Sequence, residues 1–326
     1  MDWETLATRV IEGHRTTRDE ALEIARADPA ELLPVMNAAF RVRKHFHGYE
    51  VKVHVLQNAK SGVCPEDCSF CSQSLKYNSD VPRYGMQDVE TLVAGARAAA
   101  DKGAVTYCMV TATRGPSGRE IETVTEAARR IKAEIPGISL CASLGMLKAG
   151  QAQTLAAAGI DRYNHNLETS PAHFPNIVTT HGIEDRIATV RSAREAGMEA
   201  CCGGILGMGE TQLDWVDLAL LLRELGVESV PVNFLDPRGG TPLEAAERLT
   251  PAQALLALAM FRFVHPSADL RVAGGREVTL RSLQPMALYA ANSIFTDGYL
   301  TTPGAAPSQD WQMIVDAGFT PAAGAA

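Results

Sequence analysis

The chain has 326 residues, of which 46% are hydrophobic and 21% are charged, a composition typical of a globular enzyme. Its net charge of −8 and pI near 5.5 argue against general binding to nucleic acid or to an anionic membrane surface. No apolar run approaches the roughly 20 residues of a membrane span, and the acidic start does not fit a signal peptide, so we expect a cytoplasmic protein.

In chain order, residues 1–48 carry apolar side chains at helical spacing and predict an N-terminal helical extension. Eight short β-like runs follow, each with a helix-like segment after it. Repeated βα units predict an α/β fold, a (β/α)8 TIM-type barrel over residues 49–303 with its site at the carboxyl ends of the strands. Residues 304–326 are expected to add a C-terminal helix and a flexible tail. The β-like runs span residues 51–58, 104–110, 138–143, 160–166, 198–205, 229–234, 269–273 and 292–296.

Three cysteines lie within eight residues after the first run: Cys64, Cys68 and Cys71, with the spacing C-x3-C-x2-C. Three thiolates in one short loop can ligate three irons of a cubane cluster and leave the fourth iron open, which is typical of a catalytic site. An open iron can bind S-adenosylmethionine and reduce it, releasing a deoxyadenosyl radical. A zinc site is disfavoured because no second Cys or His pair follows, and a disulfide framework fits poorly with seven cysteines in so long a chain.

Three further cysteines, Cys108, Cys141 and Cys201, lie in separate β-like runs. Because side chains alternate between the two faces of a strand, at most one of Cys201 and Cys202 faces the barrel interior, and the role of Cys202 is left open. The same alternation turns Arg271 inward, where a buried arginine requires a partner. Three inward thiolates favour a second cluster over the alternative that these cysteines are small core residues.

The fourth run places Asn164, Asn166 and Glu168 on one face and His165 on the opposite, helix-facing side. Two amides and a carboxylate suit hydrogen bonds to ribose hydroxyls, an amide or a ureido group, and a water-filled polar layer is the alternative. Asn233 is a further candidate for the interior. The glycines between residues 203 and 209 are expected to let the backbone approach a flat ligand such as adenine.

These motifs, in this order, closely resemble the biotin synthase family of the radical S-adenosylmethionine superfamily, from about residue 40 to residue 303. The resemblance rests on segments 62–73, 163–170, 201–210, 291–295 and 300–303. They read GVCPEDCSFCSQ, YNHNLETS, CCGGILGMGE, ANSIF and LTTP.

The resemblance implies that Cys64, Cys68 and Cys71 hold a 4Fe–4S cluster that cleaves S-adenosylmethionine. It also implies a 2Fe–2S cluster, which is the sulfur donor and is held by a second set of residues. A third set of residues is implied to contact S-adenosylmethionine and the substrate. The reaction implied is sulfur insertion that converts dethiobiotin to biotin, with no side chain as general acid or base. A homodimer and an electron donor, flavodoxin or ferredoxin, are implied as well. The second set is Cys108, Cys141, Cys201 and Arg271, and the third is Asn164, Asn166, Glu168, Arg186 and Asn233.

Two alternatives remain open. Another radical barrel, of the hydrogenase-maturase or methylornithine-synthase type, would share the first cysteine loop but would not need the second set together. A non-catalytic iron–sulfur scaffold would bind clusters without cleaving S-adenosylmethionine, and it would leave the polar face at Asn164 and Asn166 without a role.

Overall fold

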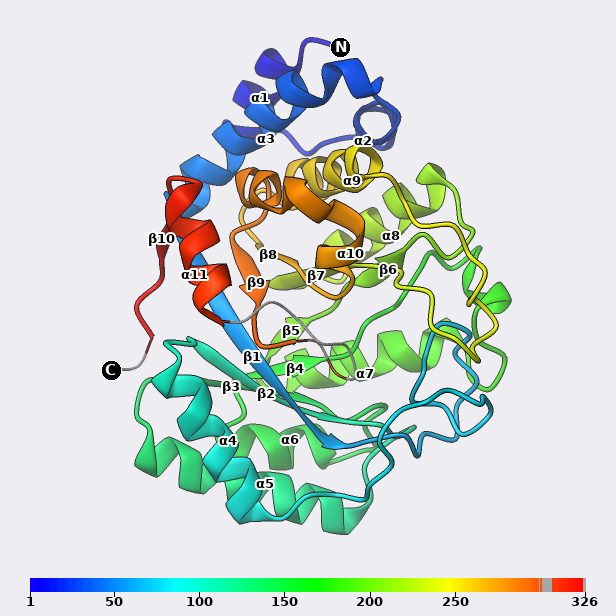
Figure 1. Cartoon of the computed structure of the whole chain (residues 1–326), viewed down its shortest axis with the longest axis vertical. Coiled ribbons are helices and arrows are strands. Elements are labelled where there is room, and N and C mark those ends of the chain that lie inside the picture. Colours follow the sequence, from blue (N-terminus) through cyan, green and yellow to red (C-terminus); the bar gives the residue numbers. More distant parts are fainter. Residues whose placement is uncertain (299, 301–306, 325–326) are drawn as a thin grey trace.

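A computed structural model describes residues 1–298, 300 and 307–324 of the chain. Parallel strands form a closed barrel at the centre, helices surround it, and the N-terminal helices pack against one end (Figure 1). Around the barrel the strands follow the chain order β1, β2, β3, β4, β5, β7, β8 and β9, and the pairing of β9 with β1 closes the ring. The predicted (β/α)8 barrel with an N-terminal helical extension is thus confirmed.

The strand bounds follow the sequence prediction closely. The run predicted at 229–234 is the strand as observed, whereas the run at 198–205 divides into β5 and β6, which both pair with β7. The strands are β1 Glu50–Lys60, β2 Thr106–Thr111, β3 Ser139–Ser143, β4 Arg162–Asn164, β5 Glu199–Cys201, β6 Gly204–Leu206, β7 Ser229–Phe234, β8 Asp269–Val272, β9 Ser293–Phe295 and β10 Thr320–Pro321.

Several helices begin at the residues that the sequence offers as caps. Thr17, Ser117 and Thr250 each accept from a backbone N–H three residues later and are closed by a reciprocal Glu or Gln, which forms a capping box. The helices are α1 Trp3–Ile11, α2 Arg18–Ala25, α3 Leu32–His47, α4 Val89–Asp101, α5 Gly118–Glu134, α6 Gln151–Ala157, α7 Ile183–Glu195, α8 Gln212–Glu224, α9 Pro251–Val264, α10 Arg276–Leu280 and α11 Pro307–Asp316, with 3-10 turns η1 Pro29–Glu31, η2 Phe174–Asn176 and η3 Arg281–Tyr289.

The C-terminal segment contains helix α11 and a short strand. After α11, strand β10 pairs in parallel with the start of β1, and the Ala322 backbone N–H donates to the Val51 carbonyl at 2.8 Å. The boundary at 303/304, and the motif at 301–303, lie outside the described residues. The division into segments 1–48, 49–303 and 304–326 therefore stays a prediction.

Each barrel strand has an apolar outer face and a polar inner face. Outward side chains such as Tyr107, Leu140, Val230 and Leu270 are fully buried against the surrounding helices. Most of the alternating inward positions carry cysteines, asparagines, serines and charged groups, although Leu56, Val110 and Pro231 also line the interior. The strand period of two thus separates a hydrophobic core outside the barrel from a polar interior.

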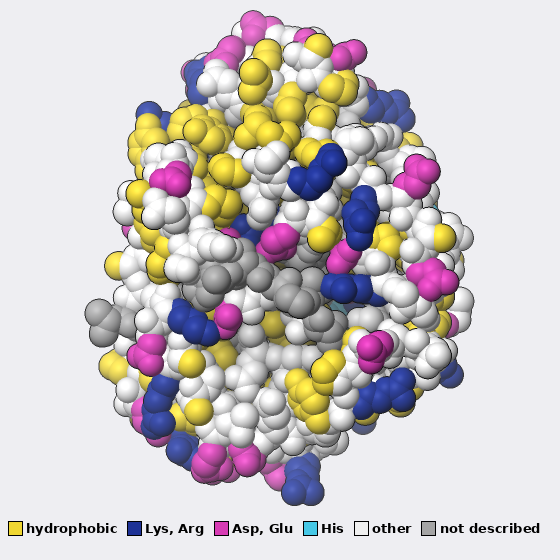
Figure 2. Space-filling model, viewed as in Figure 1, with side chains coloured by type: hydrophobic (Ala, Val, Ile, Leu, Met, Phe, Trp, Pro, Cys, Tyr) yellow, Lys and Arg dark blue, Asp and Glu magenta, His cyan; other side chains and the backbone are white. Residues whose placement is uncertain are grey.

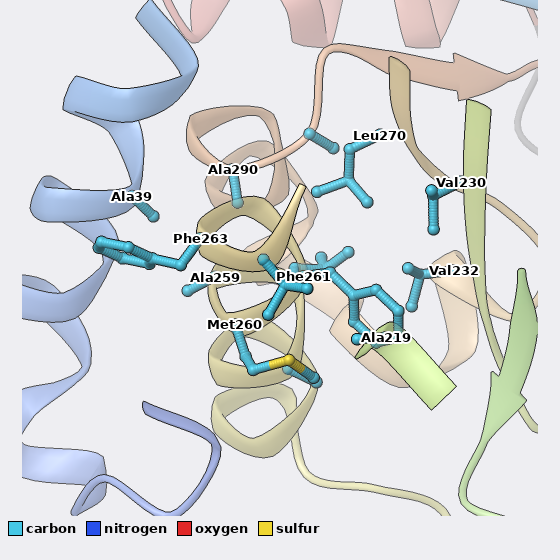
Figure 3. Packing of buried hydrophobic residues seen from close by; sticks show 14 of the residues in the cluster. Ala39, Ala219, Val230, Val232, Ala259, Met260, Phe261, Phe263, Leu270 and Ala290 are labelled. Carbon is cyan, nitrogen blue, oxygen red and sulfur yellow. The ribbon is translucent and has the colours of Figure 1, made fainter. Parts of the chain in front are cut away.

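Helix α9 joins the N-terminal helices to the barrel. It is hydrophobic on all sides, as expected for a helix covered on every face. Figure 3 shows Phe263 directed toward Ala39 of α3, while Phe261 lies toward Val232 and Leu270 of the barrel strands. The helical extension is therefore continuous with the core that supports strands β7 and β8.

Arg262 of α9 is fully buried and joins three segments of backbone. Its Nε donates to the Ala290 carbonyl at 2.8 Å, and its Nη2 donates to Asn292 Oδ1 at 2.7 Å. Its Nη1 donates to the carbonyls of His265, Pro266 and Ala268 in the turn before β8. The guanidinium therefore fixes the entries to both β8 and β9.

The charged groups of the surface are mixed rather than segregated. On the described part of the face in Figure 2, Lys and Arg side chains alternate with Asp and Glu, and hydrophobic side chains gather toward the N-terminal helices. None of the helices within residues 1–298 and 307–324 combines the length and apolar character that a membrane crossing requires.

Replacing Arg262 by Met is expected to lower the free energy of unfolding by about 3 kcal/mol or more, because several buried carbonyls lose their donor. Urea unfolding measures the loss. Arg18→Met is the matched control, since Arg18 is half exposed and pairs with Asp217 at the surface, where a change below about 1 kcal/mol is expected. Equal losses in the two variants would contradict the role given to Arg262.

Candidate active site

One cavity of about 280 Å³ opens at the carboxyl ends of the barrel strands, and it brings together all the site residues predicted from the sequence. Its lining includes segments from every barrel strand or from the loop that follows it. Among them are Cys64, Cys68, Cys71, Cys108, Cys141, Asn164, Asn166, Glu168, Arg186, Cys201, Asn233 and Arg271.

The three-cysteine loop follows β1 and is fastened at both ends. The Cys64 backbone N–H donates to Gln73 and its carbonyl accepts from Leu75, which closes the loop on itself. Within the loop, the Asp67 carboxylate accepts from the backbone N–H groups of Thr179 and Thr180 at 3.0 and 3.2 Å. The loop is therefore attached to the segment that leads into α7.

Burial favours the protonated form of the thiols in this loop. Burial raises the pKa of Cys64 and Cys68, and it raises the pKa of Cys71 to about 11. The positive charge of Arg186 opposes this rise at Cys68. Binding iron here would therefore displace protons, as it does wherever thiols become metal ligands.

Arg186, in the first turn of α7, connects the loop with the polar strand end. Its Nη1 donates to the Asn166 carbonyl at 2.8 Å and to Glu168 Oε1 at 3.1 Å. Its Nη2 lies 3.6 Å from the Cys68 sulfur. One guanidinium thus contacts a cysteine of the first set and a carboxylate of the third.

Glu168 is held in a strained backbone conformation beside the cavity. Its φ of 72° lies in the left-handed region, which non-glycine residues rarely adopt. Burial raises the pKa of its carboxyl group, and its Oε2 is buried without a hydrogen-bond partner. Backbone strain and an unsatisfied buried oxygen are both features of ligand-binding positions.

The glycines after β5 lie close to the backbone of neighbouring segments. A Cβ on Gly203 would lie 1.8 Å from the Pro231 carbonyl oxygen, and one on Gly204 would lie 2.4 Å from that of Glu168. At these two positions a glycine is required by the close approach of protein backbone. The expected approach of a flat ligand such as adenine stays a prediction.

The asparagines of the cavity are partly engaged by the protein. Asn164 Nδ2 donates to the Cys201 carbonyl and lies 3.3 Å from the Cys201 sulfur. Asn166 Oδ1 accepts from the Gly203 backbone N–H. Asn233 bridges two backbone groups, donating to the Gly204 carbonyl and accepting from the Gly274 N–H. Each amide keeps a further donor or acceptor site, because an amide offers two of each.

The second cysteine set faces the barrel interior. Cys108 and Cys141 are register partners on β2 and β3, and their side chains hydrogen-bond to each other. That hydrogen bond and burial raise the pKa of Cys108, whereas the hydrogen bond and the nearby arginines lower that of Cys141. Cys201 lines the same cavity, while Cys202 points away into the hydrophobic core.

Arg271 lies among these thiols and is almost completely buried. Its Nη1 lies 3.5 Å from the Cys201 sulfur, and its Nη2 donates to Ser229 and Asp269 and lies 3.2 Å from His54 Nε2. Its Nε is buried without a partner. One end of the guanidinium is therefore fixed by the protein, and the other is directed at the sulfur set.

The layer below the thiols contains the residue that balances this charge. The Asp269 carboxylate lies 3.4 Å from Arg162 and 3.5 Å from Arg271, and it accepts from the Ser293 hydroxyl at 2.6 Å. Burial alone would raise the pKa of Asp269, but Arg271, His54 and Arg162 outweigh burial and hold that pKa far below its usual range. Asp269 is ionised and compensates the buried Arg271, and it shares Arg162 with Glu199, whose carboxylate lies 2.6 Å from that guanidinium.

Sequence reasoning missed this lower layer, although one signal was available. Asp269 stands two residues before Arg271 in the same run, so strand alternation places both on the inner face. Its partner Arg162 lies on β4, and nothing local in the sequence connects the two residues.

The donor groups of the cavity fit iron–sulfur clusters. Cysteine thiolates are the ligands that such clusters take, and the cavity offers two sets of three thiols. Among the described residues, no three His, Cys, Asp or Glu side chains converge on a single metal ion. A polynuclear cluster distributes its cysteine ligands over several irons, so its site does not require that convergence.

Comparisons with known proteins agree with this geometry. Residues 59–222 match the model of the radical SAM superfamily, and residues 231–320 match the biotin and thiamin synthesis associated domain. The chain is 64% identical to the biotin synthase of Salinibacter ruber over 98% of this chain and 89% of that protein. It is 48% identical to the biotin synthase of Bacillus subtilis over 97% of this chain and 94% of that protein.

The chain belongs to the biotin synthase family. Membership in the radical SAM superfamily assigns it a 4Fe–4S cluster and S-adenosylmethionine. Solved structures of other enzymes share the fold of this family member. A methylornithine synthase matches with a TM-score of 0.84 at 18% identity over 97% of both chains. A FeFe-hydrogenase maturase from Carboxydothermus hydrogenoformans matches with a TM-score of 0.81 at 17% identity, over 97% of this chain and 79% of the maturase.

Replacing Asp269 by Asn is expected to lower the free energy of unfolding of the metal-free protein by about 3 to 5 kcal/mol, because the buried Arg271 loses its carboxylate partner and Arg162 keeps only Glu199. A depressed pKa gives stability that is present above the usual pKa of 3.8 and is lost only as the pH falls below it. The deficit is therefore constant between about pH 5 and pH 8.

Urea unfolding across this pH range measures the deficit. Asp217→Asn serves as the control, since Asp217 pairs with Arg18 at the surface. A stability loss at Asp269 no larger than that at Asp217 would show that the buried arginines are compensated elsewhere.

Proposed function

We propose that this chain catalyses the sulfur insertion that converts dethiobiotin to biotin. The observation that carries the proposal is the presence of a second set of three thiols, with a buried arginine, in the cavity of the C-x3-C-x2-C loop. A radical barrel that only cleaves S-adenosylmethionine needs the loop alone. The family to which the chain belongs supports the specific reaction.

The first set, Cys64, Cys68 and Cys71, is proposed to hold the 4Fe–4S cluster. When bound, this cluster with S-adenosylmethionine supplies a deoxyadenosyl radical, and the second cluster supplies the sulfur atom. The protein's own task is to bind and orient the reactants and to keep water from them.

The polar side of the cavity is proposed to bind S-adenosylmethionine. The Glu168 carboxylate is available to accept from ribose hydroxyls, and Asn166, whose side chain also hydrogen-bonds to Glu168, keeps a second amide hydrogen for the same group. The Arg186 guanidinium, next to Cys68, suits a carboxylate. Asn164 and Asn233 are proposed to contact the substrate with the donor and acceptor sites that the protein leaves open.

The inner set is proposed to hold a 2Fe–2S cluster through Cys108, Cys141, Cys201 and Arg271. The four side chains come from β2, β3, β5 and β8, so the rigid barrel fixes their mutual positions. The unpartnered Nε and the fixed Nη2 of Arg271 support a guanidinium oriented in advance toward the sulfurs. No side chain is assigned as a general acid or base.

The substrate, the electron donor and the oligomeric state are proposed from the family to which the chain belongs. Dethiobiotin is the substrate, a flavodoxin or ferredoxin is the electron donor, and a homodimer in the cytoplasm is the working form. The alternatives of a hydrogenase-maturase or methylornithine-synthase type share the fold, but their solved structures are less than 20% identical to this chain. The family relationship at 64% identity favours biotin formation.

The function is tested anaerobically. The protein is reconstituted with iron and sulfide, then given reductant, S-adenosylmethionine and dethiobiotin, and the products are analysed by mass spectrometry. Biotin together with deoxyadenosine is expected. Deoxyadenosine without biotin, in protein whose iron count accounts for both clusters, would show that the substrate is a compound other than dethiobiotin. Iron without deoxyadenosine would favour the scaffold alternative.

Two cysteine variants separate the proposed roles. Cys68→Ala is expected to abolish both deoxyadenosine and biotin, because the first cluster loses a ligand. Cys108→Ala is expected to retain deoxyadenosine formation and to lose biotin. Cys202→Ala is the matched control, since Cys202 is buried on the helix-facing side and both products should persist. Normal biotin formation by the Cys108 variant would overturn the assignment of the inner set.

A further inference from the structure

A chain of three buried side chains runs from the cysteine loop to Arg186. Arg186 Nε donates to His181 Nε2 at 2.9 Å, and His181 Nδ1 lies 2.5 Å from Glu66 Oε2. The His181 and Glu66 side chains are 2% and 6% exposed. Glu66 lies within the loop between Cys64 and Cys68, whereas Arg186 belongs to α7.

The chemistry of the three groups fixes the direction of each hydrogen bond. An arginine nitrogen can only donate, so His181 Nε2 must be the acceptor. The ring proton then resides on Nδ1 and is donated to Glu66, which accepts as a carboxylate. Burial and the positive charge of Arg186 lower the pKa of His181, which agrees with a neutral ring.

An aromatic side chain limits the movement of both basic groups. Phe174 of η2 is buried, and its ring contacts His181 edge to face at a centroid distance of 5.8 Å. The Arg186 guanidinium carbon lies 5.7 Å from the centre of the same ring. The imidazole and the guanidinium are therefore held by packing as well as by hydrogen bonds.

The other contacts of Glu66 and Arg186 do not connect these two residues to each other as His181 does. Arg114 donates to the other oxygen of Glu66 at 3.2 Å, from a side chain that is 53% exposed. The Thr180 hydroxyl also contacts Glu66. Arg186 donates to Asn166 and Glu168 through a different nitrogen, Nη1. The hydrogen bond from its Nε goes to His181.

We propose that Glu66 and His181 are positioning residues that orient the Arg186 guanidinium toward bound S-adenosylmethionine. The inference rests on the proposed function, because it assumes that Arg186 contacts this cofactor. Through Glu66, the orientation of Arg186 depends on the same loop that carries Cys64 and Cys68. The loop and the arginine are thus set as one unit, as with outer groups that orient the ligands of a metal site.

The test uses the reconstituted full chain with its 4Fe–4S cluster and measures the Kd for S-adenosylmethionine, normalised to cluster content. His181→Leu removes both hydrogen bonds and is expected to weaken binding about tenfold or more. His181→Gln restores them, since its amide oxygen accepts from Arg186 and its NH2 group donates to Glu66, and is expected to bind close to wild type. Arg114→Gln, which contacts the other Glu66 oxygen, is the control and should leave the Kd unchanged.

The EPR signal of the reduced cluster provides a second readout. Its change on addition of S-adenosylmethionine should be retained in His181→Gln and be reduced in His181→Leu at equal cofactor concentration. Equal affinity in all variants, or no rescue by Gln, would overturn the proposal. So would an equal loss in Arg114→Gln, which would assign the effect to the charge of Glu66 rather than to the chain through His181.

Two further outcomes are kept distinct. If His181→Leu does not retain iron, His181→Asn takes its place, because its side chain is too short to reach both partners. Wild-type affinity in that variant would overturn the proposal. If the wild-type protein itself fails to bind S-adenosylmethionine, the proposed function fails, whereas bound cofactor without differences among the variants removes the positioning role alone.

Discussion

The interior of this barrel depends on one carboxylate. Asp269 is buried and lies between Arg162 and Arg271. Arg162 also pairs with the half-exposed Glu199, whereas Asp269 is the carboxylate that pairs with Arg271 among the described residues. Without Asp269, the Arg271 guanidinium would be too costly to bury. Because Asp269 makes a buried arginine tolerable, the layer above can present a guanidinium among three thiols.

The same strands border a hydrophobic core on their outer face and the cavity on their inner face. Outward residues such as Val230 and Leu270 pack on α9, and this core gives the barrel its rigidity. Inward residues one position away line the cavity. A rigid support matters because ligands on different strands can keep a fixed spacing only if the strands do not move. Helix α9, on which the helical extension packs, contributes through Arg262, which fixes the entries to β8 and β9.

Much of this arrangement follows from sequence periodicity, and the exceptions have physical causes. Alternation turned Arg271 inward and allowed only one of Cys201 and Cys202 to face the interior, and in the structure Arg271 and Cys201 are the inward residues. It failed at His165, which lines the cavity, because β4 ends at Asn164 and Glu168 adopts a left-handed φ. The pairs that tie the site together are far apart in the chain. Glu66 and His181 are 115 residues apart, and no local pattern predicts such contacts.

The two sets of thiols lie at different depths, and this difference imposes an order. Cys108, Cys141 and Cys201 are buried, whereas Cys64 and Cys71 are partly exposed on the loop after β1. Because the two sets differ in exposure, a thiol reagent in solution meets Cys64 and Cys71 on the loop more readily than it meets the three inner thiols. The metal-free protein should therefore be modified first at the loop and only later inside the barrel.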